Sequence, residues 1–213
     1  MLKAFTADYV FPVSTPPVKE GVVIADESGK LEGVFTPEQF ASENFDSALQ
    51  PEKYSGIICP GFINAHCHLE LSHMRGLLKE GATLPGFISG VIKGRNAARE
   101  VIEKEICTAE DEMLSNGIVG VGDICNTSDT LAQKKKKRLR YHNFIEVFDI
   151  IPEKADAEFE KAKELLELFH ASGLPASIVP HAPYTVSQRL LKRIYEDAYA
   201  NDSLLTIHNQ IGR

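Results

Sequence analysis

Beyond about residue 58, short apolar runs alternate with segments of helical periodicity, and this alternation constrains the fold more than any other feature of the chain. Five runs have the composition of strands, namely GIICPGFINAHCH, GIVGVGDIC, LRYHNFIEVFDI, PASIVPHAPYTV and LLTIH. GIVGVG and SLLTI are apolar on both faces, as expected of strands that are buried on both sides. Strands that alternate with helices in this way predict an α/β fold with parallel strands.

The intervening segments carry helix signals. One long helical region is predicted over residues 84–116, and Gly117 suits the position just past its end. EKADAEFEKAKELLELFHASG has an apolar stripe at helical spacing, and Ser187 is predicted to cap the helix that follows it. SDTLAQKKKK is a further helical stretch. Its KKKKR run, residues 134–138, is predicted to be a solvated helix end rather than a nucleic-acid patch.

Residues 1–57 consist of short β-rich runs and turns. A hairpin is predicted around Ser28 and Gly29, and Thr36 is predicted to cap a helix that has Pro37 at its first position. These strands are too few for a self-sufficient sheet domain.

Composition restricts the classes of partner. The net charge of −7 disfavours a nucleic-acid or anionic-membrane surface and leaves a small-molecule substrate open. The four cysteines form no C-x-x-C pair, so a cysteine zinc site is not expected. No apolar run approaches the ~20 residues of a membrane helix, and the first residues lack a signal-peptide pattern. We therefore expect a soluble, cytoplasmic protein with no membrane partner.

The segment GFINAHCHLELSH contains an H-x-H pair, His66 and His68. On a strand, residues two apart face the same way, so the two imidazoles can converge on one cation at ~2.0–2.1 Å each. Cys67 then faces the opposite side. The alternative is a chance H-x-H in a polar loop. The end of an apolar strand in a parallel α/β fold favours the metal site, because sites are built at that end.

Four motifs carry a resemblance to a known family. PGFINAHCHLE resembles the first-strand signature of the amidohydrolase superfamily, P-G-[FL]-[IV]-[ND]-x-H-x-H. The similarity is greatest to the branch of cytosine-type, triazine and aminodeoxyfutalosine deaminases and chlorohydrolases. NGIVGVGD, PHAPYTVS and TIHNQ resemble, in order, the second, fourth and fifth strands of the family. The resemblance extends over almost the whole chain.

The resemblance implies a partial TIM-like (β/α)8 barrel with about five of its eight strands over residues 58–213. Residues 1–57 would be the N-terminal part of a small β-sandwich. The implied activity is metal-dependent hydrolysis of carbon–nitrogen bonds other than peptide bonds. The implied reaction is deamination of an amino-substituted nitrogen heterocycle by metal-activated hydroxide.

The resemblance also assigns roles to particular residues. His66, His68 and His208 would be metal ligands, and His181 would contact the substrate or the ligands. Glu70 would hydrogen-bond the substrate or a group behind the ligands. The fourth strand has no Lys to bridge two ions, so one divalent metal is expected, zinc in preference to Fe²⁺.

Other candidates have weaker support. Asp123 and Glu146 end the second and third strands, where they would support the ligands. His73 is predicted to lie in a solvated loop and His142 to pack in its strand. His170 lies near a helix C-terminus, where a partial positive charge is favourable.

The chain departs from the family pattern near its end. The family's proton-shuttling Glu corresponds to Ile211, and the strand-six His and strand-eight Asp have no counterpart. We therefore expect a C-terminally truncated chain whose catalytic acid is unknown. The alternatives are an inactive remnant that binds metal, a chlorohydrolase, or a ring-amide hydrolase resembling imidazolonepropionase. A homo-oligomer remains open. A phosphate-binding protein is disfavoured because no Gly-rich phosphate loop is present.

Overall fold

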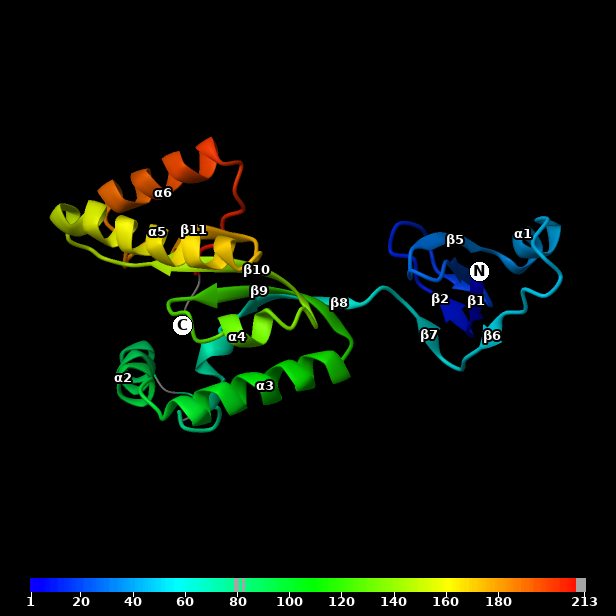
Figure 1. Ribbon diagram of the computed structural model, residues 1–213, viewed down its shortest axis with the longest axis horizontal. Helices are drawn as coiled ribbons and strands as arrows, with labels where there is room; N and C mark the ends of the chain where they lie inside the picture. The colour runs from blue at the N-terminus through cyan, green and yellow to red at the C-terminus, as the bar shows by residue number, and fades with distance from the viewer. Residues whose placement is uncertain (79–80, 82, 210–213) are drawn as a thin grey trace. The chain divides into compact units, whose positions relative to one another are not determined.

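The computed structural model of the chain describes residues 1–78, 81 and 83–209. The chain divides into two compact units, Met1–Gly61 and Phe62–Arg213, which are called here the N-terminal and C-terminal units (Figure 1). Each unit has its own sheets and its own apolar clusters. The domain boundary placed after residue 57 from the sequence stays a prediction.

The N-terminal unit contains two small sheets and one short helix. The strand order is β5-β4-β1-β6 in one sheet and β3-β2-β7 in the other. β4 and β5 pair antiparallel, which confirms the predicted hairpin, and Gly29 in its turn has φ +83°. The bounds are β1 Lys3–Thr6, β2 Tyr9–Val10, β3 Val18–Lys19, β4 Val22–Ala25, β5 Leu31–Phe35, α1 Pro37–Ser42, β6 Glu52–Lys53 and β7 Ile57–Ile58.

The sheet of the C-terminal unit is wholly parallel among its described strands, in the order β11-β10-β9-β8. Each strand pairs with the strand that follows it in the chain, so the connections between them are crossovers that contain helices. This arrangement confirms the predicted parallel α/β fold. The strands are β8 Phe62–Cys67, β9 Ile118–Cys125, β10 Arg140–Val147 and β11 Ala176–Pro180.

Helices connect these strands, and the long helical region predicted over residues 84–116 is two helices, not one. Residues 95–98 interrupt it, and the interruption lets Arg95 form an ion pair with Glu70. No helix in the described ranges is long and apolar enough to cross a bilayer. The bounds are η1 Leu69–Met74, α2 Leu84–Gly94, α3 Arg99–Ser115, α4 Leu131–Lys134, η2 Pro152–Lys154, α5 Ala155–Ala171 and α6 Gln188–Ala200.

The main core lies between the sheet and the helices α5 and α6, which run side by side over β10 and β11 (Figure 1). Ser187 caps α6 by accepting a hydrogen bond from the amide of Leu190, as predicted. Alternate residues of the strands face opposite sides. Ile145 packs against the helices, whereas Phe144 packs in a separate cluster. This two-sided burial explains the continuously apolar strand sequences.

The predicted fifth strand, LLTIH, is not a regular strand. It lies beside β11, where Ser177 Oγ donates to the carbonyl of Leu204 at 2.7 Å and the His208 amide donates to the carbonyl of His181 at 2.8 Å. Backbone bonding to the sheet is too sparse over residues 204–208 to form a ladder. The segment nevertheless delivers His208 to the carboxyl end of the sheet.

The lysine run is only partly solvated, which corrects the prediction for its first member. Lys135, Lys136 and Lys137 are exposed, but the Lys134 side chain is 0% exposed. Lys134 can be buried because its Nζ forms an ion pair with the carboxylate of Asp123, in β9, at 2.5 Å. A buried lysine needs such a partner.

Replacement of Phe169 tests the helix–sheet core. Phe169 is 0% exposed in the main cluster, so Phe169→Ala should lower the free energy of unfolding by about 3–5 kcal/mol. The matched control is its neighbour Leu168, which is 45% exposed, and Leu168→Ala should change the free energy by about 0.5 kcal/mol. Urea unfolding followed by circular dichroism measures both, and equal losses would contradict the described packing.

Candidate metal centre

The H-x-H pair lies where β8 becomes irregular. The pairing of β8 with β9 shifts register between Asn64 and Cys67. At this point the carbonyl oxygen of Ala65 lies only 2.6 Å from the place that a Cβ atom on residue 122 would occupy. Gly122 is therefore required, since any side chain there would displace the backbone next to His66.

The structure brings the two histidines of the pair together, as the sequence predicts. Their ring centroids lie 5.2 Å apart. His66 belongs to β8, whereas His68 comes just after it and precedes the helix η1. His68 is half-buried and His66 is more exposed.

His208 approaches this pair from the other end of the chain. Its ring centroid lies 4.7 Å from that of His66, and its Nε2 lies 3.2 Å from Nε2 of His68. The three histidines have ligand atoms that all lie within 4.8 Å of one another.

The surroundings of His208 determine which ring nitrogen carries the proton. Nδ1 lies 3.0 Å from the carbonyl oxygen of His181 and 3.2 Å from Oε1 of Glu146. The carbonyl oxygen can only accept, so its contact favours the Nδ1–H tautomer, while Glu146 Oε1 lies nearby without a hydrogen-bond partner among the described residues. Nε2 is then left with its lone pair on the side of His68. Hydrogen bonding of one imidazole nitrogen to orient the other is typical of metal-binding histidines.

Glu146 and His181 complete a second group around His208. The ligand atoms of these three residues also lie within 4.8 Å of one another. Glu146 is buried at the end of β10. The side-chain amide of Asn126 donates to Oε2 of Glu146 at 3.1 Å and to the backbone carbonyl of Glu146 at 3.2 Å. His181 follows β11, and its Nδ1 lies 2.8 Å from Thr185 Oγ1.

Burial favours the neutral form of the imidazoles of His66, His68 and His181. It lowers the pKa of His68 to about 4, and the neighbouring His66 and His208 lower it further as like charges. Burial also lowers the pKa of His66 and of His181. The neutral imidazole is the form that binds a metal ion.

The donor set fits a zinc-type ion. Two nitrogens bound to one ion at ~2.0–2.1 Å in tetrahedral geometry are separated by roughly 3.3 Å, close to the 3.2 Å between the Nε2 atoms of His68 and His208. Nδ1 of His68 is buried without a hydrogen-bond partner among the described residues.

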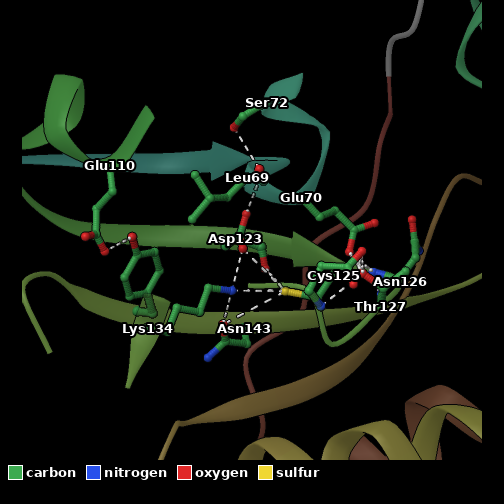
Figure 2. Close-up of polar contacts among 12 residues, drawn as sticks. Leu69, Glu70, Ser72, Glu110, Asp123, Cys125, Asn126, Thr127, Lys134 and Asn143 are labelled. Carbon is green, nitrogen blue, oxygen red and sulfur yellow. Dashed lines mark hydrogen bonds and ion pairs between the residues drawn. The ribbon is translucent and has the colours of Figure 1, made fainter. Parts of the chain in front are cut away.

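Glu70 joins two loops rather than standing free. It is 3% exposed, and its Oε2 accepts hydrogen bonds from the amides of Asn126 and Thr127 and from Thr127 Oγ1, at 2.8–3.1 Å (Figure 2). Its Oε1 pairs with Arg95. Burial raises the pKa of Glu70, while Arg95 and these hydrogen bonds oppose the rise. A direct contact of Glu70 with substrate stays a prediction.

The other histidines serve the fold or lie apart from this group. His142 Nε2 lies 3.0 Å from Ser177 Oγ, and His170 Nε2 lies 3.2 Å from the carbonyl of Ala176. The ring nitrogens of His73 are buried, although a solvated loop was predicted. Ile211, at the position of the expected catalytic Glu, lies outside the described residues.

Sequence reasoning missed Arg95, Asn126 and Lys134. Asn126 carried a usable signal, because it directly follows an apolar strand at the end where sites form. Arg95 carried none, since a charged residue within a helical region ordinarily indicates a solvated face.

Comparison with known proteins identifies the family. The profile of the Amidohydrolase family matches residues 57–211. Aminodeoxyfutalosine deaminase of Deinococcus radiodurans is 30% identical over 195 residues, which cover 88% of this chain and 44% of that protein. A solved structure of Helicobacter pylori aminofutalosine deaminase in complex with methylthio-coformycin matches with a TM-score of 0.78 at 24% identity, covering 97% of this chain and 50% of that chain.

A solved structure of an adenosine deaminase from Xanthomonas campestris with bound zinc has a TM-score of 0.71 at 19% identity, covering 96% of this chain and 48% of that chain. The chain thus spans about half the length of the relatives it matches. The structural matches confirm the predicted partial barrel fold. The profile match extends over residues 57–211, which is most of the length of this chain, and the chain therefore belongs to the amidohydrolase family.

Proposed function

We propose that this chain carries the metal-binding part of a hydrolase that acts on carbon–nitrogen bonds other than peptide bonds. Its substrate is an amino-substituted nitrogen heterocycle, which loses its amino group as ammonia. The observation that carries the proposal is the convergence of three imidazoles, those of His66, His68 and His208. Membership of the amidohydrolase family and similarity to deaminases support it.

The three imidazoles bind one divalent ion, for which zinc is preferred and Fe²⁺ is the alternative. When bound, such an ion supplies Lewis-acid chemistry and lowers the pKa of water towards ~7. The chain's own residues provide orientation. The His181 carbonyl accepts from Nδ1 of His208, and the Glu146 carboxylate lies 3.2 Å from the same nitrogen, so Nε2 would be the nitrogen directed at the ion.

His181 orients the substrate. Its Nδ1 contacts Thr185 Oγ1, which leaves Nε2 as the nitrogen that meets the heterocycle. The ring centroid of His181 lies 4.8 Å from that of His208. A heterocycle that is hydrogen-bonded to His181 therefore lies next to the metal ligands. No described residue is assigned as the acid for the departing nitrogen, because the position of the family's proton-shuttling Glu corresponds to Ile211.

Metal binding tests the first part of the proposal. The folded chain should bind about one equivalent of Zn²⁺, and His208→Ala should weaken binding by at least ~100-fold, since loss of a ligand exceeds the ~10–100-fold effect of its supporting groups. Competition with a chromophoric chelator measures the affinity. His170→Ala is the control, because His170 lies near the end of α5 and its Nε2 contacts the carbonyl of Ala176, at the start of β11, away from the three ligands. A folded chain that takes up no zinc would refute the site.

Product analysis tests the reaction. We expect zinc-dependent ammonia release from adenosine-type nucleosides, abolished by a chelator. His181→Ala should lower kcat/KM at least about tenfold, because a hydrogen bond to the substrate is lost, while zinc stoichiometry stays unchanged. Chloride release would identify a chlorohydrolase, and ring opening would identify a ring-amide hydrolase. Bound zinc with no product from any of these substrates would identify a metal-binding chain without catalysis.

A further inference from the structure

A chain of polar contacts leads from Lys134 of α4, through Asp123 of β9, to the segment that carries His68 (Figure 2). Asp123 of β9 is 0% exposed, and its Oδ1 accepts a hydrogen bond from the backbone amide of Leu69 at 2.8 Å. Leu69 directly follows His68 and begins η1. The contact therefore fixes the backbone at the point where the chain leaves the H-x-H pair.

The other oxygen of this carboxylate is held by Lys134. Nζ of Lys134 lies 2.5 Å from Asp123 Oδ2, 2.6 Å from Asn143 Oδ1 and 3.3 Å from Cys125 Sγ, and Figure 2 shows it between β9 and β10. Burial alone lowers the pKa of Lys134, but Asp123 and Cys125 raise it, and the net direction is upward. Lys134 therefore remains a cation and keeps the Asp123 carboxylate in one orientation.

Stability alone does not explain this buried pair. Removing two charges from water is expensive, and well-packed apolar residues of similar volume stabilise a protein as well or better. Lys134 also packs against aromatic rings, with Nζ 5.1 Å from the ring centroid of Tyr141 and 5.2 Å from that of Phe169. The distinctive consequence of the pair is that a carboxylate oxygen is aimed at the Leu69 amide.

The ring of His68 depends on this backbone anchor. Its Nδ1 has no hydrogen-bond partner within the described ranges, and its Nε2 faces His208. Metal-binding histidines are ordinarily oriented through the nitrogen that does not bind the ion. Since that support is absent among the described residues, the backbone on either side of His68 must set the position of the imidazole.

We propose that Asp123, held by Lys134, is a positioning residue that places the His68 imidazole for metal binding through its hydrogen bond to the Leu69 amide. The inference rests on the proposed function in taking His68 as a metal ligand. It assigns to Asp123 a role at the centre although its side chain contacts none of the three histidines through a hydrogen bond.

Two double variants isolate the hydrogen bond. Both Asp123→Asn with Lys134→Met and Asp123→Leu with Lys134→Met remove the charge pair, and Asn and Leu are close in size to Asp. Only Asn retains an oxygen that accepts from Leu69. We expect the Leu variant to bind Zn²⁺ at least about tenfold more weakly than the Asn variant in a chelator competition assay. In metal-free protein, the Leu69 amide should exchange its hydrogen faster in the Leu variant.

Glu110→Gln is the matched control. Glu110 is also 0% exposed in the helix layer, where it accepts from Tyr141 OH at 2.8 Å and from Gln133, and it makes no hydrogen bond to η1. Its replacement should lower the urea midpoint and leave zinc affinity unchanged. If Glu110→Gln weakens zinc binding as much as the Leu variant does, general loosening of the layer is the cause and the positioning role is wrong.

Equal zinc affinity and equal Leu69 exchange in the two double variants would overturn the proposal. If the Leu variant does not fold, Asp123→Ala with Lys134→Met replaces it, because Ala also lacks the oxygen that accepts from Leu69: weaker zinc binding than in the Asn variant supports the proposal, and equal binding overturns it. If the wild-type chain binds no zinc, the proposed metal centre fails. The exchange comparison still decides in that case whether Asp123 fixes the backbone after His68.

Discussion

Parallel pairing of four successive strands is the constraint on which the candidate centre depends. Because β8, β9, β10 and β11 run in the same direction, their carboxyl ends meet at one edge of the sheet. His66 and His68 come at the end of β8, Glu146 lies at the end of β10, and His181 follows β11. The His181 amide bonds to the carbonyl of Val147, and β10 pairs with β11 up to Val147 and Pro180, so His181 lies one residue beyond the last pair, at the carboxyl edge of the sheet.

This edge is further shaped by polar side chains that connect one loop to the next. Glu70, after β8, binds the backbone of Asn126, after β9, and the Asn126 side chain binds Glu146 in β10. Glu146 in turn lies against His208. Each link is buried or half-buried, where an unmade hydrogen bond is costly, so the links favour one arrangement of the loops. The centre is thus organised by contacts between strand ends rather than by any one strand.

Much of the fold could be predicted because its signals are local. The apolar run GIVGVG indicated β9, and the hydroxyls of Thr36 and Ser187 indicated helix starts that the structure contains. The H-x-H spacing and the family motifs indicated the three histidines that the structure brings together. These features depend on residues a few positions apart, which a sequence displays directly.

The features that escaped prediction depend on partners distant in the chain. Lys134 belongs to the lysine run 134–138, whose composition indicates a solvated segment. Only the three-dimensional position of Asp123 explains the burial of Lys134. Arg95 stands at the break between α2 and α3 and pairs with Glu70, which lies 25 positions away in the chain. Residues 204–208 have strand composition, but a ladder requires regular backbone bonding to β11, which composition cannot report. Such pairings follow from register and packing rather than periodicity.

The separation of His68 and His208, 140 positions along the chain, has a consequence for assembly. An ion shared by these two imidazoles closes a very long loop, and in an unfolded chain the entropy of closing it opposes binding. The H-x-H pair alone offers only two donors. High affinity therefore arises after the sheet has formed, and occupancy of the centre reports completion of long-range folding rather than initiating it.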